Sequence, residues 1–248
     1  MFNFLKKTKN QEISVVFFVY VALLIIGFFA YKDYGVSVDE WELRILGFSN
    51  LKYIAEIFFQ SSVIEIDKIL IAPDLGDYLG THGAIFALPT AFIEYIFNIE
   101  DSENYYLLRH YFNHLIFLVS TFYFFLLVKT RFDNWVFGLF AAMFLFFSPR
   151  IFAESFYNHK DLIFLSFFII SLYYGIKFYR LPNFKNAIFF SIATALAVDI
   201  RIMGTVIVPI IITLTYLKNT KNKKKIISSL LVFFSSLIFF TVLFWPYL

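Results

Sequence analysis

The sequence predicts an all-α polytopic membrane protein, with about seven transmembrane helices and a long external first loop that carries membrane-surface helices. Two observations support this fold class, and a third excludes other classes. Of the 248 residues, 60% are apolar, well above the roughly half that soluble domains contain. Apolar runs of about 17 to 25 residues, long enough to cross a bilayer, recur along the chain. The chain has no cysteine, which excludes disulfide scaffolds and thiolate metal sites. We expect one domain, residues 1–248.

The expected spans follow from the apolar runs and the charges between them. The first run has no small-residue cleavage site after it, so we expect a membrane anchor rather than a signal peptide. Asp199 and Arg201 interrupt an apolar stretch of 31 residues, 187–217, which is too long for one crossing at about 1.5 Å per residue. This predicts a tight helical hairpin with "DIR" at its tip. The expected spans are 13–31, 107–128, 135–152, 161–179, 187–200, 202–217 and 226–245.

The positions of Lys and Arg predict a cytoplasmic N-terminus. The run 83–97 decides on which side of the membrane the later loops lie, because a crossing there would put "KTRFDN" and "KNTKNKKK" on the side opposite the basic N-terminus. We therefore expect a membrane-embedded helix that does not cross and that Pro89 kinks. The cytoplasmic face then holds 13 of the 21 basic residues but only Glu12 and Asp133 among the acids. The outer face holds the other 16 acidic residues and the external loop 32–106.

Ionisable side chains gather at span ends on the outer face, where such groups mark a pathway or a site. Each has a simpler explanation alone, because Asp39 and Asp161 suit helix caps and Arg201 or Lys160 could extend to lipid headgroups. Together, the carboxylates offer a general base and the cations can hold a phosphate. This combination favours transfer of a group from a phosphate-linked lipid. The set comprises Asp39, Glu40, His82, Arg109, His110, the segment 148–161, Asp199 and Arg201. Glu94 has no assigned role.

These residues resemble motifs of the GT-C superfamily of integral membrane glycosyltransferases, near the protein O-mannosyltransferases and the lipid A aminoarabinose transferases. The resemblance lies in the order of the motifs along nearly the whole chain. The motifs are "SVDEWELRIL", "HGAIFALPTAFIEYIF", "LLRHYFNHLIFL", "FFSPRIFAESFYNHKDLIFLSFF" and "ALAVDIRIMGTVIVP". Members of this superfamily usually continue beyond seven spans, so we expect this chain to correspond to the N-terminal module.

The resemblance implies an enzyme that moves a hexosyl or pentosyl sugar from a polyprenyl-phosphate donor to a lipid, glycan or protein acceptor. The site would face the periplasm of a bacterial inner membrane, and direct displacement would invert the anomeric carbon. By position, Asp39 would be the catalytic base, with Asp161 and Glu40 as further acids of the site. The residues that the resemblance assigns to the donor phosphate are Arg201, Lys160, Arg109 and His82.

Cofactors and partners are less specified by the sequence. Asp39 and Glu40 could together hold a divalent cation, since paired carboxylates suit hard metals, but we assign no cofactor and no metal ligand. The expected partners are membrane lipids, the polyprenyl-phosphate-linked sugar and its acceptor. Nothing in the composition indicates a nucleic-acid partner.

Three other classes of protein remain open. A lipid flippase or solute transporter would place charges at the bilayer midplane and break its spans with Gly or Pro, whereas the charges here gather at one face. A polysaccharide polymerase or ligase would carry a late external loop rich in Arg or His. A non-catalytic membrane component would tolerate replacement of Asp39 or Arg201.

Overall fold

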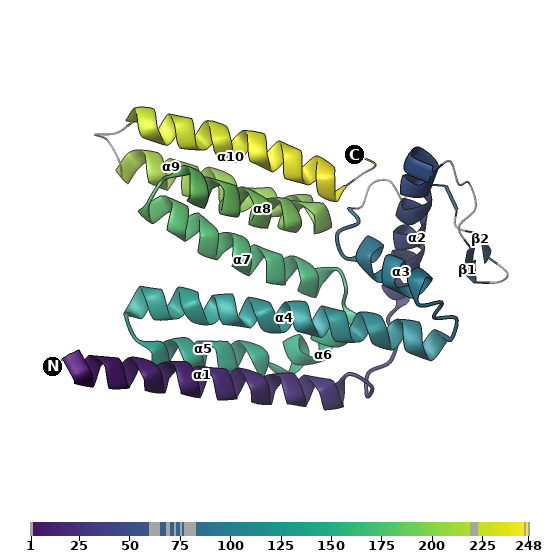
Figure 1. The fold of residues 1–248 in the computed structure, drawn as a ribbon, viewed down its shortest axis with the longest axis horizontal. Helices are drawn as coiled ribbons and strands as arrows, with labels where there is room; N and C mark the ends of the chain where they lie inside the picture. The colour runs from purple at the N-terminus through teal and green to yellow at the C-terminus, as the bar shows by residue number, and fades with distance from the viewer. Residues whose placement is uncertain are drawn as a thin grey trace.

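The fold was analysed in a computed structural model, which describes residues 2–59, 65–67, 70–71, 73–74, 76, 83–218, 223–245 and 247. The helices that include the expected spans lie side by side in one bundle, and a cap of two helices and a pair of short strands lies across one end of it (Figure 1). The all-α polytopic membrane fold expected from the sequence is thereby confirmed.

The bundle and the cap divide the elements between them. The bundle contains α1 (Phe2–Ala30), α4 (Ser102–Phe132), α5 (Trp135–Phe146), α6 (Pro149–Tyr157), α7 (Asp161–Arg180), α8 (Phe184–Ile200), the 3₁₀ helix η2 (Ile202–Val206), α9 (Ile207–Lys218) and α10 (Lys223–Phe244). The cap contains α2 (Val38–Phe59), α3 (Ala87–Ile96) and a short antiparallel pair of strands, β1 (Glu65–Asp67) and β2 (Leu70–Ile71).

Four described helices are long and apolar enough to cross a membrane: α1 from Gln11, α4, α7 and α10. The pair α5 and α6 passes the same test of length and composition if it is one bent span. The expected spans 187–200 and 202–217 fall in α8 and in η2 with α9, which are shorter helices on either side of a break at Arg201. In Figure 1 the chain reverses at this break, as expected for a hairpin. The total of seven spans stays a prediction.

The span expected at 135–152 is divided, because α5 and α6 meet at an angle of 65°. Pro149 is the first residue of α6, and Ser148 before it has an extended backbone (φ −61°, ψ 115°). Proline disfavours the helical conformation in the residue that precedes it and cannot donate a backbone hydrogen bond. The helix therefore stops and restarts in a new direction, which carries the α6–α7 connection towards the cap.

The segment 83–97 forms a helix only at Ala87–Ile96. Ten residues span about 15 Å, so α3 is too short to cross a bilayer of about 30 Å. The kink expected at Pro89 is wrong, because Pro89 lies in the first turn of α3. There its missing N–H has no acceptor within the helix in any case.

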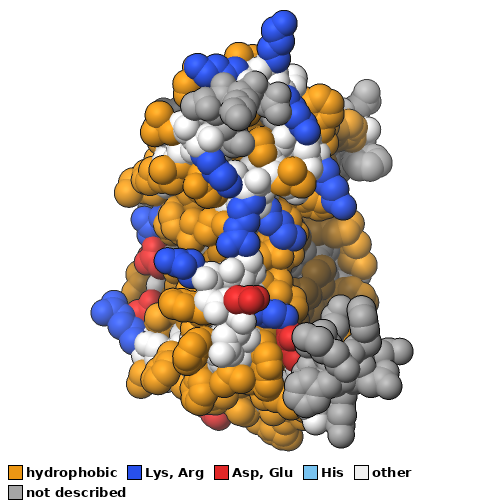
Figure 2. Space-filling view, turned by 90° about the vertical axis from the view of Figure 1, so that its left-hand side faces the viewer, with side chains coloured by type: hydrophobic (Ala, Val, Ile, Leu, Met, Phe, Trp, Pro, Cys, Tyr) orange, Lys and Arg blue, Asp and Glu red, His pale blue; other side chains and the backbone are white. Residues whose placement is uncertain are grey.

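One end of the bundle is basic (Figure 2). It holds the last turns of α4 and α7, with Lys129, Arg131, Lys177 and Arg180, and the start of α10. Cations at helix C-termini also interact favourably with the helix dipole. The cap, the α6–α7 connection and the break at Arg201 lie at the opposite end (Figure 1). The charge asymmetry expected from the sequence is therefore present in the fold. Which end faces the cytoplasm stays a prediction.

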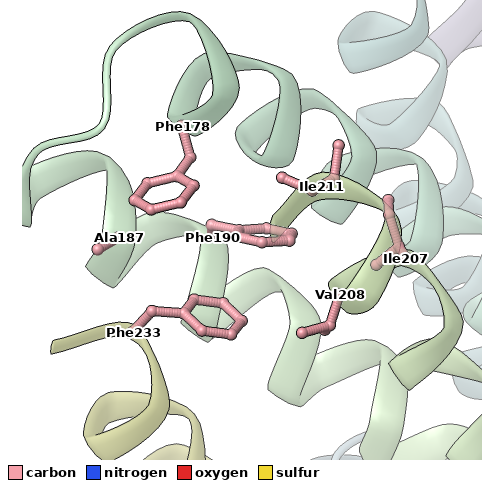
Figure 3. Close-up of a cluster of buried hydrophobic side chains, with 7 residues drawn as sticks. All are labelled: Phe178, Ala187, Phe190, Ile207, Val208, Ile211 and Phe233. Carbon is pink, nitrogen blue, oxygen red and sulfur yellow. The ribbon is translucent and has the colours of Figure 1, made fainter. Parts of the chain in front are cut away.

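A cluster of buried apolar side chains holds α7, α8, α9 and α10 together (Figure 3). Its members are Phe178, Ala187, Phe190, Ile207, Val208, Ile211 and Phe233. The rings of Phe190 and Phe233 stack with their centroids 4.7 Å apart. In a bilayer, helices associate through such close packing rather than through transfer of apolar surface out of water. This packing fixes the position of the break at Arg201 relative to the start of α7.

Candidate functional site

The N-terminus of α2 lies against the α6–α7 connection. The Ser37 hydroxyl donates to the Tyr157 carbonyl at 3.1 Å, and the Ser37 backbone N–H donates to Glu40 Oε1 at 2.7 Å. The second contact is half of a capping box, in which an acid three residues into a helix returns to its cap. Asp39 is exposed at this helix start and has no hydrogen-bond or ion-pair partner among the described residues. Asp39 and the residues before Asp161 therefore belong to one end of the bundle.

Asp161 and Arg201 form an ion pair at the same end. Asp161 is the first residue of α7, where its backbone N–H donates to the Asn158 side chain at 2.8 Å. Arg201 has an extended backbone between α8 and η2 (φ −148°, ψ 130°). Both side chains are open to solvent, with 56% of Asp161 and 39% of Arg201 exposed. The structure thus brings together two residues that the sequence analysis assigned to one site, from positions 40 residues apart.

Asp199 holds the segment that precedes α3. Its Oδ2 accepts a hydrogen bond from the Ile85 backbone N–H at 2.8 Å. A Cβ atom at Gly83 would lie 2.1 Å from the Asp199 carbonyl oxygen, so only glycine allows this close approach. Asp199 is buried, and its carboxylate serves to dock residues 83–85 on the end of α8. His82, which the sequence analysis assigned to the donor phosphate, lies outside the described residues.

Glu94 on α3 joins two arginines from neighbouring helices. Arg44 on α2 donates from Nε to Glu94 Oε1 at 2.9 Å, and Nη1 of Arg109 on α4 lies 2.6 Å from Glu94 Oε2. At most 2% of each of these side chains is exposed. The Arg44 guanidinium also lies 3.7 Å from the ring centroid of Tyr105, which is a favourable cation–π geometry. These ion pairs fasten α2 and α3 to the capped end of α4.

This pairing gives Glu94 a structural role that the sequence did not indicate. Arg109, assigned to the donor phosphate from the sequence, is 1% exposed and also donates to the Tyr105 carbonyl at 2.9 Å. Its direct contact with a donor phosphate stays a prediction. Lys160 precedes α7 at its N-cap position and is half-buried beside Asp161.

Glu40 points into the molecule and meets two histidines. Its Oε2 lies 3.0 Å from Nε2 of His110 on α4 and 3.8 Å from Nε2 of His159 in the α6–α7 connection. All three side chains are buried. Burial lowers the pKa of His159 well below its usual value, and the nearby His110 and Arg109 lower it further. The paired carboxylates expected from Asp39 and Glu40 therefore do not converge, because Asp39 is exposed while Glu40 is buried.

His159 and His110 were not singled out as partners of Glu40 from the sequence. His110 lies 70 residues from Glu40 along the chain, and no local pattern links them. The only sequence signal was that both histidines occur in the span-end segments of the outer face.

The fold and the site define an integral membrane protein that gathers carboxylates and arginines at one capped end of a helical bundle. Residues 88–245, more than half of the chain, match the family model described as dolichyl-phosphate-mannose-protein mannosyltransferase. The chain therefore belongs to this family, which is of the GT-C type of membrane glycosyltransferases and uses polyprenyl-phosphate-linked sugars. The resemblance expected from the sequence is confirmed. No curated protein and no solved structure matches the chain.

The matched range includes Arg109, Asp161 and Arg201. It begins after Asp39 and Glu40, so the expectation that they belong to the site stays a prediction, based on the motif "SVDEWELRIL".

Proposed function

We propose that this protein transfers a sugar from a polyprenyl-phosphate donor to a lipid, glycan or protein acceptor at the capped end of the bundle. One observation carries the proposal: the Asp161–Arg201 ion pair lies next to the segment that receives the N-terminus of α2. An exposed carboxylate, a second carboxylate and a guanidinium thus come from three distant parts of the chain to one end of the bundle. The family description names mannose and protein, and these are the first sugar and acceptor to test.

Arg201 is suited to hold the donor phosphate. A guanidinium has five N–H donors, and Asp161 accepts from only one side of it. The rest of the side chain remains open, since 39% of it is exposed. It can therefore bind a phosphate oxygen while the ion pair with Asp161 keeps the side chain in place, and Lys160 adds positive charge nearby.

Asp39 is suited to act as the general base. It would take the proton from the acceptor hydroxyl as the acceptor oxygen bonds to the anomeric carbon. The bond from that carbon to the phosphate oxygen would break at the same time, and its electron pair would leave with the lipid phosphate. Arg201 would stabilise the charge that develops there, which is the usual role of a fixed cation at a leaving group. A single displacement of this kind inverts the anomeric carbon.

The charge asymmetry supports a periplasmic location for the capped end in a bacterial inner membrane. Lys and Arg residues tend to remain cytoplasmic, and the basic end of the bundle holds the N-terminal end of α1 (Figure 1). The opposite, capped end would then face outward. Nucleotide sugars are cytosolic, so an outward-facing site requires a sugar that is already attached to a membrane lipid.

The test is a transfer assay with the full chain in detergent or nanodiscs and polyprenyl-phosphate mannose as the donor. We expect Asp39→Asn to reduce kcat by about 10²–10⁴-fold, the usual contribution of a general base. Arg201→Ala should mainly raise the KM for the donor. The matched controls are Glu42→Gln, an exposed acid on the same helix, and Arg180→Ala at the basic end of the bundle. Wild-type rates in Asp39→Asn would exclude the base, and an unchanged donor KM in Arg201→Ala would exclude the phosphate contact.

A further inference from the structure

We propose that Glu40, His110 and His159 form a binding site for one divalent transition-metal ion of the zinc type. This site is separate from the Asp39 and Glu40 pair considered from the sequence, and it does not depend on the proposed transferase activity. It combines one carboxylate with two imidazoles, from α2, α4 and the α6–α7 connection.

The distances suit a single metal ion. Glu40 Oε2 lies 3.0 Å from His110 Nε2 and 3.8 Å from His159 Nε2, and all three ligand atoms lie within 4.8 Å of one another. In a tetrahedral zinc site with bonds of about 2.0–2.2 Å, ligand atoms are about 3.3–3.6 Å apart. The Glu40–His110 distance is slightly shorter than this range, and the Glu40–His159 distance is slightly longer. Small side-chain adjustments of Glu40 and His159 would bring both distances into the range.

The chemistry of the ligands selects the metal. Imidazole nitrogens suit zinc and similar transition metals, whereas magnesium and calcium prefer oxygen ligands alone. Two histidines and a glutamate are also a known zinc ligand set that leaves a fourth position open.

Unpaired nitrogen atoms provide an independent observation. His159 is fully buried, yet neither of its ring nitrogens makes a hydrogen bond of good geometry with any described residue, although the Phe156 carbonyl lies nearby. Nδ1 of His110 is likewise buried and unpaired. A buried polar atom without a partner costs about 1–3 kcal/mol. A metal ion would give His159 Nε2 the partner that the described residues do not supply.

The charges around Glu40 are compatible with a bound cation. Arg109 lies near His159, but Arg109 and Arg44 both form ion pairs with Glu94. Among the described residues, Glu40 contacts no arginine, and its carboxylate is met only by the two imidazoles and the Ser37 backbone N–H. A metal ion would therefore compensate a buried carboxylate. It would also tie the residue after Asp39 to the segment that ends at Asp161.

The experiment measures metal content in the full chain, purified in detergent with an affinity tag that contains no histidine. After incubation with Zn²⁺ and removal of the excess, we expect about one equivalent of zinc. Substitution with Co²⁺ should give the visible absorption of a tetrahedral nitrogen and oxygen site. His159→Ala and His110→Ala should weaken zinc binding by more than the roughly 10–100-fold that loss of a second-shell contact causes. His114→Gln is the matched control, because His114 is a buried histidine on α4 that hydrogen-bonds to Ser155 instead.

The outcomes separate this proposal from the proposed function, since no sugar donor is present. Wild-type protein that retains no zinc and gives no Co²⁺ spectrum would overturn the site, even if the histidine variants fail to fold. Zinc bound equally by wild type and by both ligand variants would also overturn it, because the metal would then lie elsewhere.

Discussion

Glu94 is the residue whose neutralisation should damage the cap most. In Glu94→Gln, the guanidinium groups of Arg44 and Arg109 both lose their ion pair with the Glu94 carboxylate. Two unit charges 4 Å apart interact by about 4 kcal/mol at an effective dielectric constant of 20, and part of this gain offsets the desolvation of Glu94. Breaking a buried ion pair by removing one partner costs about 3–5 kcal/mol. For a chain of this size, that loss lowers the Tm by about 6–20 °C.

Thermal unfolding in detergent, followed by the loss of the monodisperse peak in size-exclusion chromatography, measures this effect. Glu103→Gln is the matched control, because Glu103 is an exposed acid at the start of α4 and should change stability by less than about 0.5 kcal/mol. The double variant Glu94→Gln/Arg109→Met should recover part of the loss, since it removes the buried charge of Arg109, which pairs with Glu94 in the wild type. A Tm within about 2 °C of wild type for Glu94→Gln would refute the ion-paired arrangement.

Two further predictions test the docking of the cap and the orientation of the bundle. Gly83→Ala should lower stability by about 1–3 kcal/mol, the usual cost of overpacking, because its Cβ would lie 2.1 Å from the Asp199 carbonyl oxygen. Gly35→Ala is the control and should be neutral in the same thermal assay, because nothing lies within 4 Å of the added Cβ. Equal effects in the two variants would contradict the contact between Gly83 and Asp199. The chain has no cysteine, so single cysteines can report the orientation of the bundle. A cysteine that replaces Val38, which is 91% exposed, should react with an impermeant thiol reagent in intact cells, whereas a cysteine that replaces Arg131 should react only after permeabilisation. The reverse pattern would show that the capped end faces the cytoplasm.

The helices, the membrane setting and the charge asymmetry were predictable because their signals are local. Apolar runs identify membrane-length helices whatever their neighbours, and the basic segments at alternate loops indicate which helix ends lie together. The break at Arg201 was predictable for the same reason, since Asp199 and Arg201 interrupt an apolar run. The bend at Pro149 was missed although proline is a local signal, because apolar length alone made 135–152 look like a continuous span. Pro89 was misjudged because its effect depends on where the helix begins.

The family could also be inferred from the sequence, because the motifs keep their order along the chain. The geometry of the site could not. Asp39 and Glu40 are neighbours with the same charge, yet one faces solvent and the other is buried, and this choice depends on how α2 packs. Glu94 meets Arg44 across 50 residues, Glu40 meets His110 across 70, and Ser37 meets Tyr157 across 120. Contacts between such distant residues leave no periodic pattern in the sequence. The sequence determined which groups gather at the capped end, and only the tertiary structure decided which carboxylate is paired, which is buried with histidines and which stays exposed.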